Sequence, residues 1–392
     1  MEKRSDTMST MARTHGLDGS LVAPDWPPLT ADEVRALLRE FPGLAGPVEI
    51  LSVSPRPFSA ASVVLAGSQQ VFVKRHSRAV RDCTALMEEH RFLAHLRGRG
   101  AAVTDVLRTK SGATAIESGP WTYEVHAVPP GIDLYENAIS WTPFRSVAHA
   151  HAAGVALAQL HGASRGYDAP PRAVRPLIAS FSIFSADDAR DALADYLAAR
   201  PALREDAQTR RDCAAAMELL VPFHQDLRPL LAGLEPLWTH NDLHASNLFW
   251  SDASDEACAT ATIDFGLADR TYAVHDLAVA IERNVVEWLR LGSSEVPVHF
   301  DHLHALLAGY ESVQRLLPNE AAALAPMLAL CHAEFALTEA DYFLGVLHSP
   351  DKARVATHDY LVGHARWFRG EAGQRLLDAI RAWAAERSEE PR

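Results

Sequence analysis

Two short apolar segments around a polar turn constrain the fold of this chain more than any other feature. Residues 247–250 (NLFW) and 257–263 (ACATATI) are strand-like, and SDASDE between them is typical of a turn. The pattern predicts an antiparallel hairpin that places Asn247 and Asp264 roughly opposite each other. Because antiparallel partners lie about 5 Å apart, the amide oxygen and the carboxylate can share one divalent cation. Ligation by oxygen alone favours Mg²⁺, which keeps water molecules and completes its shell with phosphate oxygens.

A third polar residue, Asp242, lies five residues before Asn247, in the loop that enters the predicted hairpin. A carboxylate there can accept the proton of an attacking hydroxyl group while a metal ion holds the phosphates. The full pattern is H-x-D-x-x-x-x-N over residues 240–247, followed by I-D-F-G over 263–266. Either half alone is a weak signal, whereas both halves joined by a hairpin of suitable length indicate phosphoryl transfer.

The chain changes character at PPG, residues 129–131. Before this point the pattern is mostly that of strands, with one helix over residues 78–97, and after it the pattern is helical. With 392 residues the chain is also long for one domain. We therefore expect an α+β protein with a β-rich lobe over residues 26–128 and a larger α-helical lobe over residues 129–392.

Composition excludes several kinds of partner. The chain has 37 Lys+Arg against 50 Asp+Glu, a net charge of −13, which disfavours binding to nucleic acids and to anionic membranes. Its four cysteines are scattered and form no CxxC pair, as expected in a reducing cytoplasm. No apolar run approaches the roughly 18 residues that span a bilayer. Residues 1–25 lack the apolar segment of a signal peptide and are expected to be a disordered leader.

These motifs resemble those of the kinase-like small-molecule phosphotransferases, the group of aminoglycoside phosphotransferases, choline kinases and homoserine kinases. The resemblance covers about residues 45–345 and implies a protein-kinase-like fold with ATP and Mg²⁺ bound between the two lobes. By position, it implies that Asp242 is the catalytic base and that Asn247 and Asp264 are the metal ligands. It also implies that Asp276, in HDLA, supports the catalytic loop.

The resemblance implies a lysine–glutamate pair in the first lobe. Lys74, in VFVKRH, matches the strand lysine that holds the nucleotide phosphates, and Glu89, in EHRFLAHL, matches the helix glutamate that pairs with it. Three leucines at helical spacing share a face with Glu89, so this residue is expected to point inward. The adjacent Glu88 is the alternative.

The rest of the implied nucleotide site has one departure from the family. The segment EVHAVPPG, with His126 and Val128, matches the hinge whose backbone meets the adenine ring. The phosphate loop, SPRPFSAAS, has no glycine. A close approach of the backbone to the phosphates must therefore come from Ser59, Ala60 and their neighbours.

Two histidines and an asparagine in the catalytic loop have other interpretations. His240 is expected to be a buried, hydrogen-bonded support for the loop rather than a proton donor. His240 and His244 also resemble the ligand spacing of metal-dependent hydrolases, but no further histidine or carboxylate cluster in the sequence completes such a site. Asn241 lies where the family often has glycine, and we expect no catalytic consequence.

The phosphoryl acceptor is predicted to be a small molecule that carries a hydroxyl group. Protein kinases share the loop motifs, but they need an activation segment and an Ala-Pro-Glu to bind a polypeptide. Here only LADRTYAVHDLA separates the Asp-Phe-Gly motif from the next helix. A catalytically inactive nucleotide-binding protein is a further alternative, although such proteins commonly lack one of the residues found here. The sequence leaves open the identity of the acceptor, the choice between ATP and GTP, and the oligomeric state.

Overall fold

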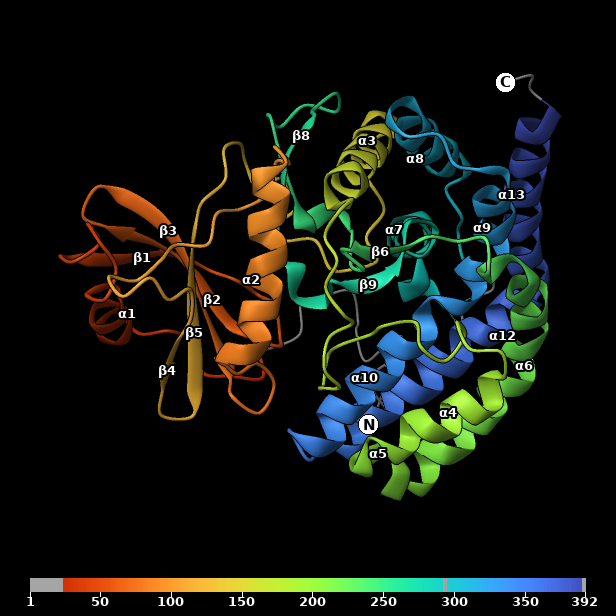
Figure 1. Cartoon of the computed structure of the whole chain (residues 1–392), viewed down its shortest axis with the longest axis horizontal. Coiled ribbons are helices and arrows are strands. Elements are labelled where there is room, and N and C mark those ends of the chain that lie inside the picture. Colours follow the sequence, from red (N-terminus) through yellow and green to blue (C-terminus); the bar gives the residue numbers. More distant parts are fainter. Residues whose placement is uncertain (1–23, 292, 294, 390–392) are drawn as a thin grey trace, which may run out of the picture.

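The computed structural model describes residues 24–291, 293 and 295–389. A β-sheet part and a larger helical part lie side by side, with helix α2 between the sheet and the helical part (Figure 1). Most of the expected leader, residues 1–25, lies outside the described residues, and only Pro24 and Asp25 of it are placed.

The sheet has five antiparallel strands in the order β1-β2-β3-β5-β4. The strands are β1 (Val48–Val53), β2 (Ala60–Ala66), β3 (Gln69–Ser77), β4 (Ile116–Ser118) and β5 (Trp121–Ala127). One face packs against α1 (Ala31–Leu38), with Val64, Val71 and Val73 fully buried. Helix α1 was not among the elements expected from the sequence, although Thr30 and Glu33 form a capping box at its start.

Helix α2 (Cys83–Gly98) connects the sheet to the catalytic loop. It begins five residues later than the expected helix over 78–97, because the side chain of Asp82 caps it by accepting a hydrogen bond from Ala85 N. Its buried Phe92 lies 5.3 Å from the Trp238 ring and 6.0 Å from the Phe265 ring, measured between centroids. The Asp-Phe-Gly segment is therefore packed directly against this helix.

The helical part is built around α7 (Ala273–Val285), all of whose residues are buried. Its other α-helices are α3 (Val147–Ser164), α4 (Ala189–Ala198), α5 (Pro201–Glu205), α6 (Ala207–Leu231), α8 (Phe300–Val313), α9 (Pro318–Leu330), α10 (His332–Gly345), α11 (Pro350–Arg354), α12 (Gly363–Arg369) and α13 (Glu371–Glu389). The stretch Pro318–Gly345 is long and apolar enough to cross a membrane by those two criteria, but 89% of its most apolar window is buried inside the protein. It therefore forms part of the core of the helical part.

Two short strand pairs carry the motifs that are predicted to be catalytic. Strand β6 (Pro236–Thr239) pairs with β9 (Asp269–Tyr272), and β7 (Leu248–Trp250) pairs with β8 (Ala259–Thr262) in the predicted hairpin. The register differs from the expected one by a residue, since Ile263 N donates to Asn247 O over 2.9 Å. Ile263, not Asp264, therefore lies opposite Asn247.

Candidate active site

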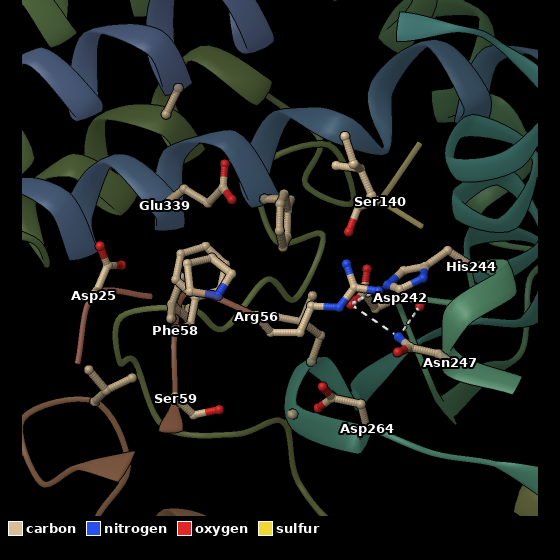
Figure 2. Close-up of a pocket in the computed structure, with 18 of the residues that line it drawn as sticks. Asp25, Arg56, Phe58, Ser59, Ser140, Asp242, His244, Asn247, Asp264 and Glu339 are labelled. Atoms are coloured by element: carbon tan, nitrogen blue, oxygen red, sulfur yellow. Dashed lines mark hydrogen bonds and ion pairs between the residues drawn. The ribbon is translucent and has the colours of Figure 1, made fainter. Parts of the chain in front are cut away.

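A cavity of about 330 Å³ lies where the sheet part meets the helical part. Five of the residues predicted from the sequence line it: Ser59, Lys74, Asp242, Asn247 and Asp264. Figure 2 shows Asp242, Asn247 and Asp264 on one side of this cavity and Glu339 on the other. The remaining predicted residues lie behind its wall.

The loop that carries Asp242 is held from behind by Asp276, which projects from α7 and is fully buried. Its two carboxylate oxygens accept hydrogen bonds from His240 N and Asn241 N, each over 2.8 Å. His161 Nε2 lies 3.0 Å from Asp276 Oδ2. The His240 ring lies 2.9 Å from Ile263 O, so it joins the loop to the hairpin. Both His240 and Asp276 thus fix the loop backbone.

Asn241 makes the sharp turn of this loop with a φ of 63°. Most residues avoid this left-handed region, whereas glycine and asparagine tolerate it. Its side-chain oxygen accepts hydrogen bonds from the Thr239 and Thr271 hydroxyl groups, over 2.8 and 3.1 Å. This geometry explains why an asparagine can replace a glycine at the position.

Asp242 is a partly buried carboxylate with a cationic neighbour. Arg283 Nε, from α7, lies 3.3 Å from Asp242 Oδ1. Burial raises the pKa of Asp242 to about 6, against the opposing effects of the Arg283 and His240 charges. A carboxylate with that pKa is mostly ionised at neutral pH and basic enough to accept a proton. No sequence pattern indicated Arg283, because it lies far along the chain from the motif.

Asn247 and Asp264 both offer an oxygen to the cavity. The Asn247 amide nitrogen donates to Asp242 O over 2.8 Å, and Asp264 Oδ1 pairs with Lys74 Nζ at 3.0 Å. The side-chain oxygen of Asn247 and the Oδ2 atom of Asp264 have no hydrogen-bond or ion-pair partner in the described part of the chain. These two oxygens fit a hard cation such as Mg²⁺.

The backbone and the charge of Asp264 are both unusual. Its φ is 58° and its ψ is 72°, a left-handed conformation that turns the chain directly after the hairpin. Burial alone would raise the pKa of Asp264, but the Lys74 ammonium group overrides it and holds the pKa below its ordinary value. The carboxylate therefore stays ionised, as a metal ligand must.

Lys74 pairs with Asp264 rather than with Glu89, the partner implied by the resemblance. Glu89 is buried on α2, and its charge acts on Lys74 together with those of Asp264 and Glu124. Burial would lower the pKa of Lys74, but these three carboxylates raise it above its ordinary value. The adjacent Glu88 turns away and lies 3.4 Å from Arg172 Nε.

Glu124, which sequence reasoning missed, is surrounded by three histidines. His76 Nε2 lies 2.8 Å from its Oε1, and His90 and His126 Nε2 lie 2.7 and 2.8 Å from its Oε2. The donor atoms of His90, Glu124 and His126 are close enough together to hold a metal ion. Each of these atoms already takes part in a hydrogen bond, so the cluster is complete without a metal ion.

The expected hinge and loop residues occupy different places. The His126 ring points to Glu124, and neither His126 nor Val128 lines the cavity. Ser59 lines it, whereas Ala60 begins β2 and is buried in the sheet. Arg56, from the same loop as Ser59, also lines the cavity, and the sequence analysis did not single it out.

His240 and His244 do not share a site. His244 Nδ1 lies 2.8 Å from Ser246 Oγ, and its Nε2 lies 3.7 Å from Asp242 Oδ2. The His240 ring instead lies within hydrogen-bond distance of Ile263 O. Burial holds the pKa of His244 well below its ordinary value, so its ring is neutral. This arrangement does not support the metal-hydrolase interpretation.

One side of the cavity is mostly aromatic. Trp141, Phe335 and Tyr360 pack together there, and Trp141 and Phe335 also contact Arg283. Glu339 projects from α10 on the side of the cavity away from Asn247 (Figure 2). Glu339 has no hydrogen-bond or ion-pair partner among the described residues. Burial raises the pKa of Glu339 to about 8. A single unpaired carboxyl group in an apolar wall is suited to a ligand that brings a hydrogen-bond donor or a cation.

Comparison with protein families and solved structures places this geometry in context. A family model described as "Phosphotransferase enzyme family" matches residues 57–316, well over half of the chain. A search of curated protein sequences found no match.

Among solved structures, a microcompartment-associated aminopropanol kinase superposes with a TM-score of 0.57 at 17% identity, covering 88% of this chain and all of its own length. An aminoglycoside phosphotransferase from Alicyclobacillus acidocaldarius superposes with a TM-score of 0.52 at 16% identity, covering 92% and 98%. An amicoumacin kinase solved with AMP-PNP and Ca²⁺ superposes with a TM-score of 0.54 at 13% identity, covering 84% and 91%. These similarities confirm the predicted kinase-like α+β fold.

Proposed function

The chain belongs to the phosphotransferase enzyme family, and from that premise we propose that it transfers the γ-phosphoryl group of ATP to a hydroxyl group of a small molecule. One observation carries the proposal. The unpartnered oxygens of Asn247 and Asp264, the ammonium group of Lys74 and the carboxylate of Asp242 all line one cavity. This set supplies the metal ligands, the phosphate charge partner and the base that phosphoryl transfer requires.

Each side chain has a separate task in the proposed reaction. Asn247 and Asp264 would hold Mg²⁺, which neutralises phosphate charge when bound. Lys74 neutralises further charge from the side of the sheet. Asp242 orients the acceptor hydroxyl group and takes its proton as the acceptor oxygen attacks the γ-phosphorus atom. Arg283 holds Asp242 in place, since its Nε lies 3.3 Å from the carboxylate. Catalysis would then come mostly from positioning and from fixed charges.

The aromatic side of the cavity is the proposed acceptor site. Its rings contact Arg283, which pairs with Asp242, so an acceptor held there can present a hydroxyl group to Asp242. The printed names of the structural neighbours include an aminopropanol kinase and an amicoumacin kinase, which supports a small acceptor and a nucleotide donor. We propose a cytoplasmic enzyme with an ATP-binding lobe over residues 26–128 and a helical substrate lobe over residues 129–392.

Removal of a metal ligand tests the proposal. We expect Asp264→Ala to abolish the Mg²⁺-dependent part of ATP affinity, measured by titration calorimetry with and without Mg²⁺. Asp252→Ala is the matched control, because Asp252 lies in the exposed turn of the same hairpin. Unchanged Mg²⁺-dependent affinity in Asp264→Ala would contradict the metal assignment.

An ATP-consumption screen against hydroxylated metabolites and aminoglycosides then separates the enzyme from the inactive alternative. Turnover with at least one alcohol supports the proposal. Tight Mg·ATP binding without any turnover across the library would favour an inactive nucleotide-binding protein instead.

A further inference from the structure

The loop between β1 and β2 offers few backbone donors to a phosphate group. Phosphate-binding loops usually work through a run of backbone N–H groups. In this loop Pro55 and Pro57 have no N–H group, and Arg56 N donates weakly to Ser54 Oγ over 3.4 Å. The two prolines also restrict the backbone, because each fixes its φ near −65°. The backbone N–H groups of Phe58 and Ser59 remain, so a side-chain donor would add to a short set of backbone donors.

The side chain of Arg56 reaches from this loop across the cavity to the helical part. Its Nη2 donates to Ala138 O over 3.0 Å and to Ser246 Oγ over 2.5 Å. In Figure 2 its guanidinium group points to the side of the cavity that carries Asp242, and Asp264 lies below it. The charges of Asp242 and Asp264 both act on Arg56, so it is a cation close to the proposed base and to a proposed metal ligand.

Only part of the Arg56 hydrogen-bonding capacity is used. A guanidinium group has five N–H donors in a planar fork. Both hydrogen bonds described above come from Nη2, and no described residue accepts from Nε or Nη1. The Nε and Nη1 hydrogens therefore remain for phosphoryl oxygens, and hydrogen bonds from a charged guanidinium group are stronger than neutral ones.

Two hydrogen bonds lead from Arg56 through Ser246 to His244, whose ring lies close to Asp242. Because Ser246 Oγ accepts from Arg56, its own hydrogen is free to go to His244 Nδ1, 2.8 Å away. The neutral His244 ring then carries its proton on Nε2, which lies 3.7 Å from Asp242 Oδ2. The arginine is therefore fixed to the same loop that carries the proposed base.

We propose that Arg56 is a catalytic residue whose guanidinium group binds the γ-phosphoryl oxygens of the nucleotide. It neutralises their charge as the bond from phosphorus to the ADP oxygen breaks and the bond to the acceptor oxygen forms. The acceptor proton goes to Asp242, and Arg56 stays protonated throughout. This arginine adds to the few backbone donors of a glycine-free loop that contains two prolines. The inference rests on the proposed function, since it assigns a residue to the same reaction.

The test compares nucleotides that differ by the γ-phosphate. Arg56→Ala is expected to bind Mg·ADP within about threefold of the wild type but to lose at least about tenfold of its affinity for Mg·AMP-PNP, the loss of a charge-assisted hydrogen bond to the γ-phosphate. Titration calorimetry measures both affinities. The control is Arg78→Ala, because Arg78 lies on the exposed surface of the same part and pairs with Glu117.

Kinetics provide the second measurement. Turnover of Arg56→Ala is expected to fall by a factor on the order of 10² to 10³, the usual cost of one transition-state donor. Added guanidine should restore part of this loss in Arg56→Ala but none in Asp242→Asn. Arg56→Lys should retain the positive charge but lack the planar guanidinium donors, so its turnover should stay below that of the wild type. If no acceptor has been found, hydrolysis of ATP by water is the reaction measured.

The outcomes separate the two proposals. If Arg56→Ala and Arg56→Lys, both with wild-type melting temperatures, keep wild-type turnover and AMP-PNP affinity, Arg56 has no role and the inference is overturned. Equal losses of ADP and AMP-PNP affinity would also overturn it. They would show that Arg56 maintains the shape of the loop and does not bind the γ-phosphate. If the wild type itself binds neither nucleotide, the proposed function fails and the inference fails with it.

Discussion

At Asp242, burial and charge act in opposite directions, and the balance decides whether the residue can be a base. A fully solvated aspartate has a pKa near 4 and is a weak proton acceptor. Burial raises the pKa of Asp242 to about 6, and Arg283 keeps it from rising further. The residue is therefore still ionised at neutral pH, yet more basic than a surface aspartate.

The pH dependence of turnover follows from this pKa. The base must be ionised, so kcat/KM should fall as the pH is lowered through about 6 and level off above it. Asp242→Asn should lower kcat by a factor on the order of 10² to 10⁴, leave ATP affinity nearly intact and remove the acidic limb of the profile. Steady-state kinetics between pH 5 and about 8 check this. A wild-type profile without an acidic limb, or a fully active variant, would show that another group is the base.

The sequence specifies the residues that lie close together along the chain and misses those that meet only after folding. Asp242, Asn247 and Asp264 belong to one local hairpin, so their spacing predicts their proximity. Arg56 and Arg283 reach the same site from distant elements, and no local periodicity indicates where a surface-type residue will point. The register at Asn247 differs by one residue from the predicted one, because the pairing of Leu248 with Thr262 continues and puts Asn247 opposite Ile263.

At the scale of the elements, the crossing of α3 and α8 leaves no room for a side chain at two glycines. A Cβ on Gly154 would lie within 3 Å of Leu306 O and Tyr310 N, and one on Gly309 would meet His151 O. The two helices thus approach each other backbone to backbone through their glycines. Helix α3 also carries His161, which contacts Asp276 behind the catalytic loop, so this crossing supports the active site.

Gly154→Ala should therefore destabilise the protein. We expect the free energy of unfolding to fall by at least about 1–3 kcal/mol, the usual cost of overpacking a close contact. Gly162→Ala is the control on the same helix, because its Cβ would meet nothing within 4 Å. This control should be neutral or gain about 0.5–1 kcal/mol from the higher helix propensity of alanine. Urea unfolding followed by circular dichroism measures both, and equal stability of the two variants would refute the close-packing argument.

At the scale of the whole molecule, Asp25 joins the two parts next to the cavity. Asp25 N donates to Pro57 O over 3.0 Å, and Asp25 Oδ1 pairs with Lys352 Nζ at 2.5 Å. Its other oxygen accepts from the Tyr342 hydroxyl group over 3.1 Å. The residue thus ties the loop that carries Arg56 to the end of α10 and to α11. We interpret it as a fixed tether that sets the width of the cavity.

Loss of this tether should loosen the nucleotide site. Asp25→Ala is expected to lower the free energy of unfolding by about 1–3 kcal/mol, the loss of hydrogen bonds to a buried charged group. It should also raise the KM for ATP several-fold. The control is Asp32→Ala, because Asp32 forms an exposed pair with Arg35 that contributes roughly 0–1 kcal/mol. Thermal unfolding and ATP kinetics are the measurements, and an unchanged KM would show that Asp25 does not set the cavity width.

The overall architecture was easier to predict from the sequence than the positions of single residues or elements. The change from alternating strands to helices near PPG predicts the two-part α+β fold, which the structural neighbours confirm. The family match likewise confirms the prediction of a phosphotransferase enzyme. Helix α1 was missed although it is amphipathic and begins with a capping box, because it has only eight residues, and the tether at Asp25 was missed because its partners lie far along the chain. Their roles depend on contacts with segments far along the chain.

The position of Trp141 has an optical consequence. Its indole ring lines the cavity at the proposed acceptor site, edge-on to Tyr360 with centroids 5.2 Å apart and with the Arg283 guanidinium group 5.3 Å from its centroid. Indole fluorescence responds to the polarity and the charges around the ring. A compound that enters this side of the cavity would therefore change the emission of the unlabelled protein, and a Trp141→Phe difference spectrum would isolate that signal from the other seven tryptophans. The enzyme thus contains a built-in reporter with which the unknown acceptor can be sought before any product is detected.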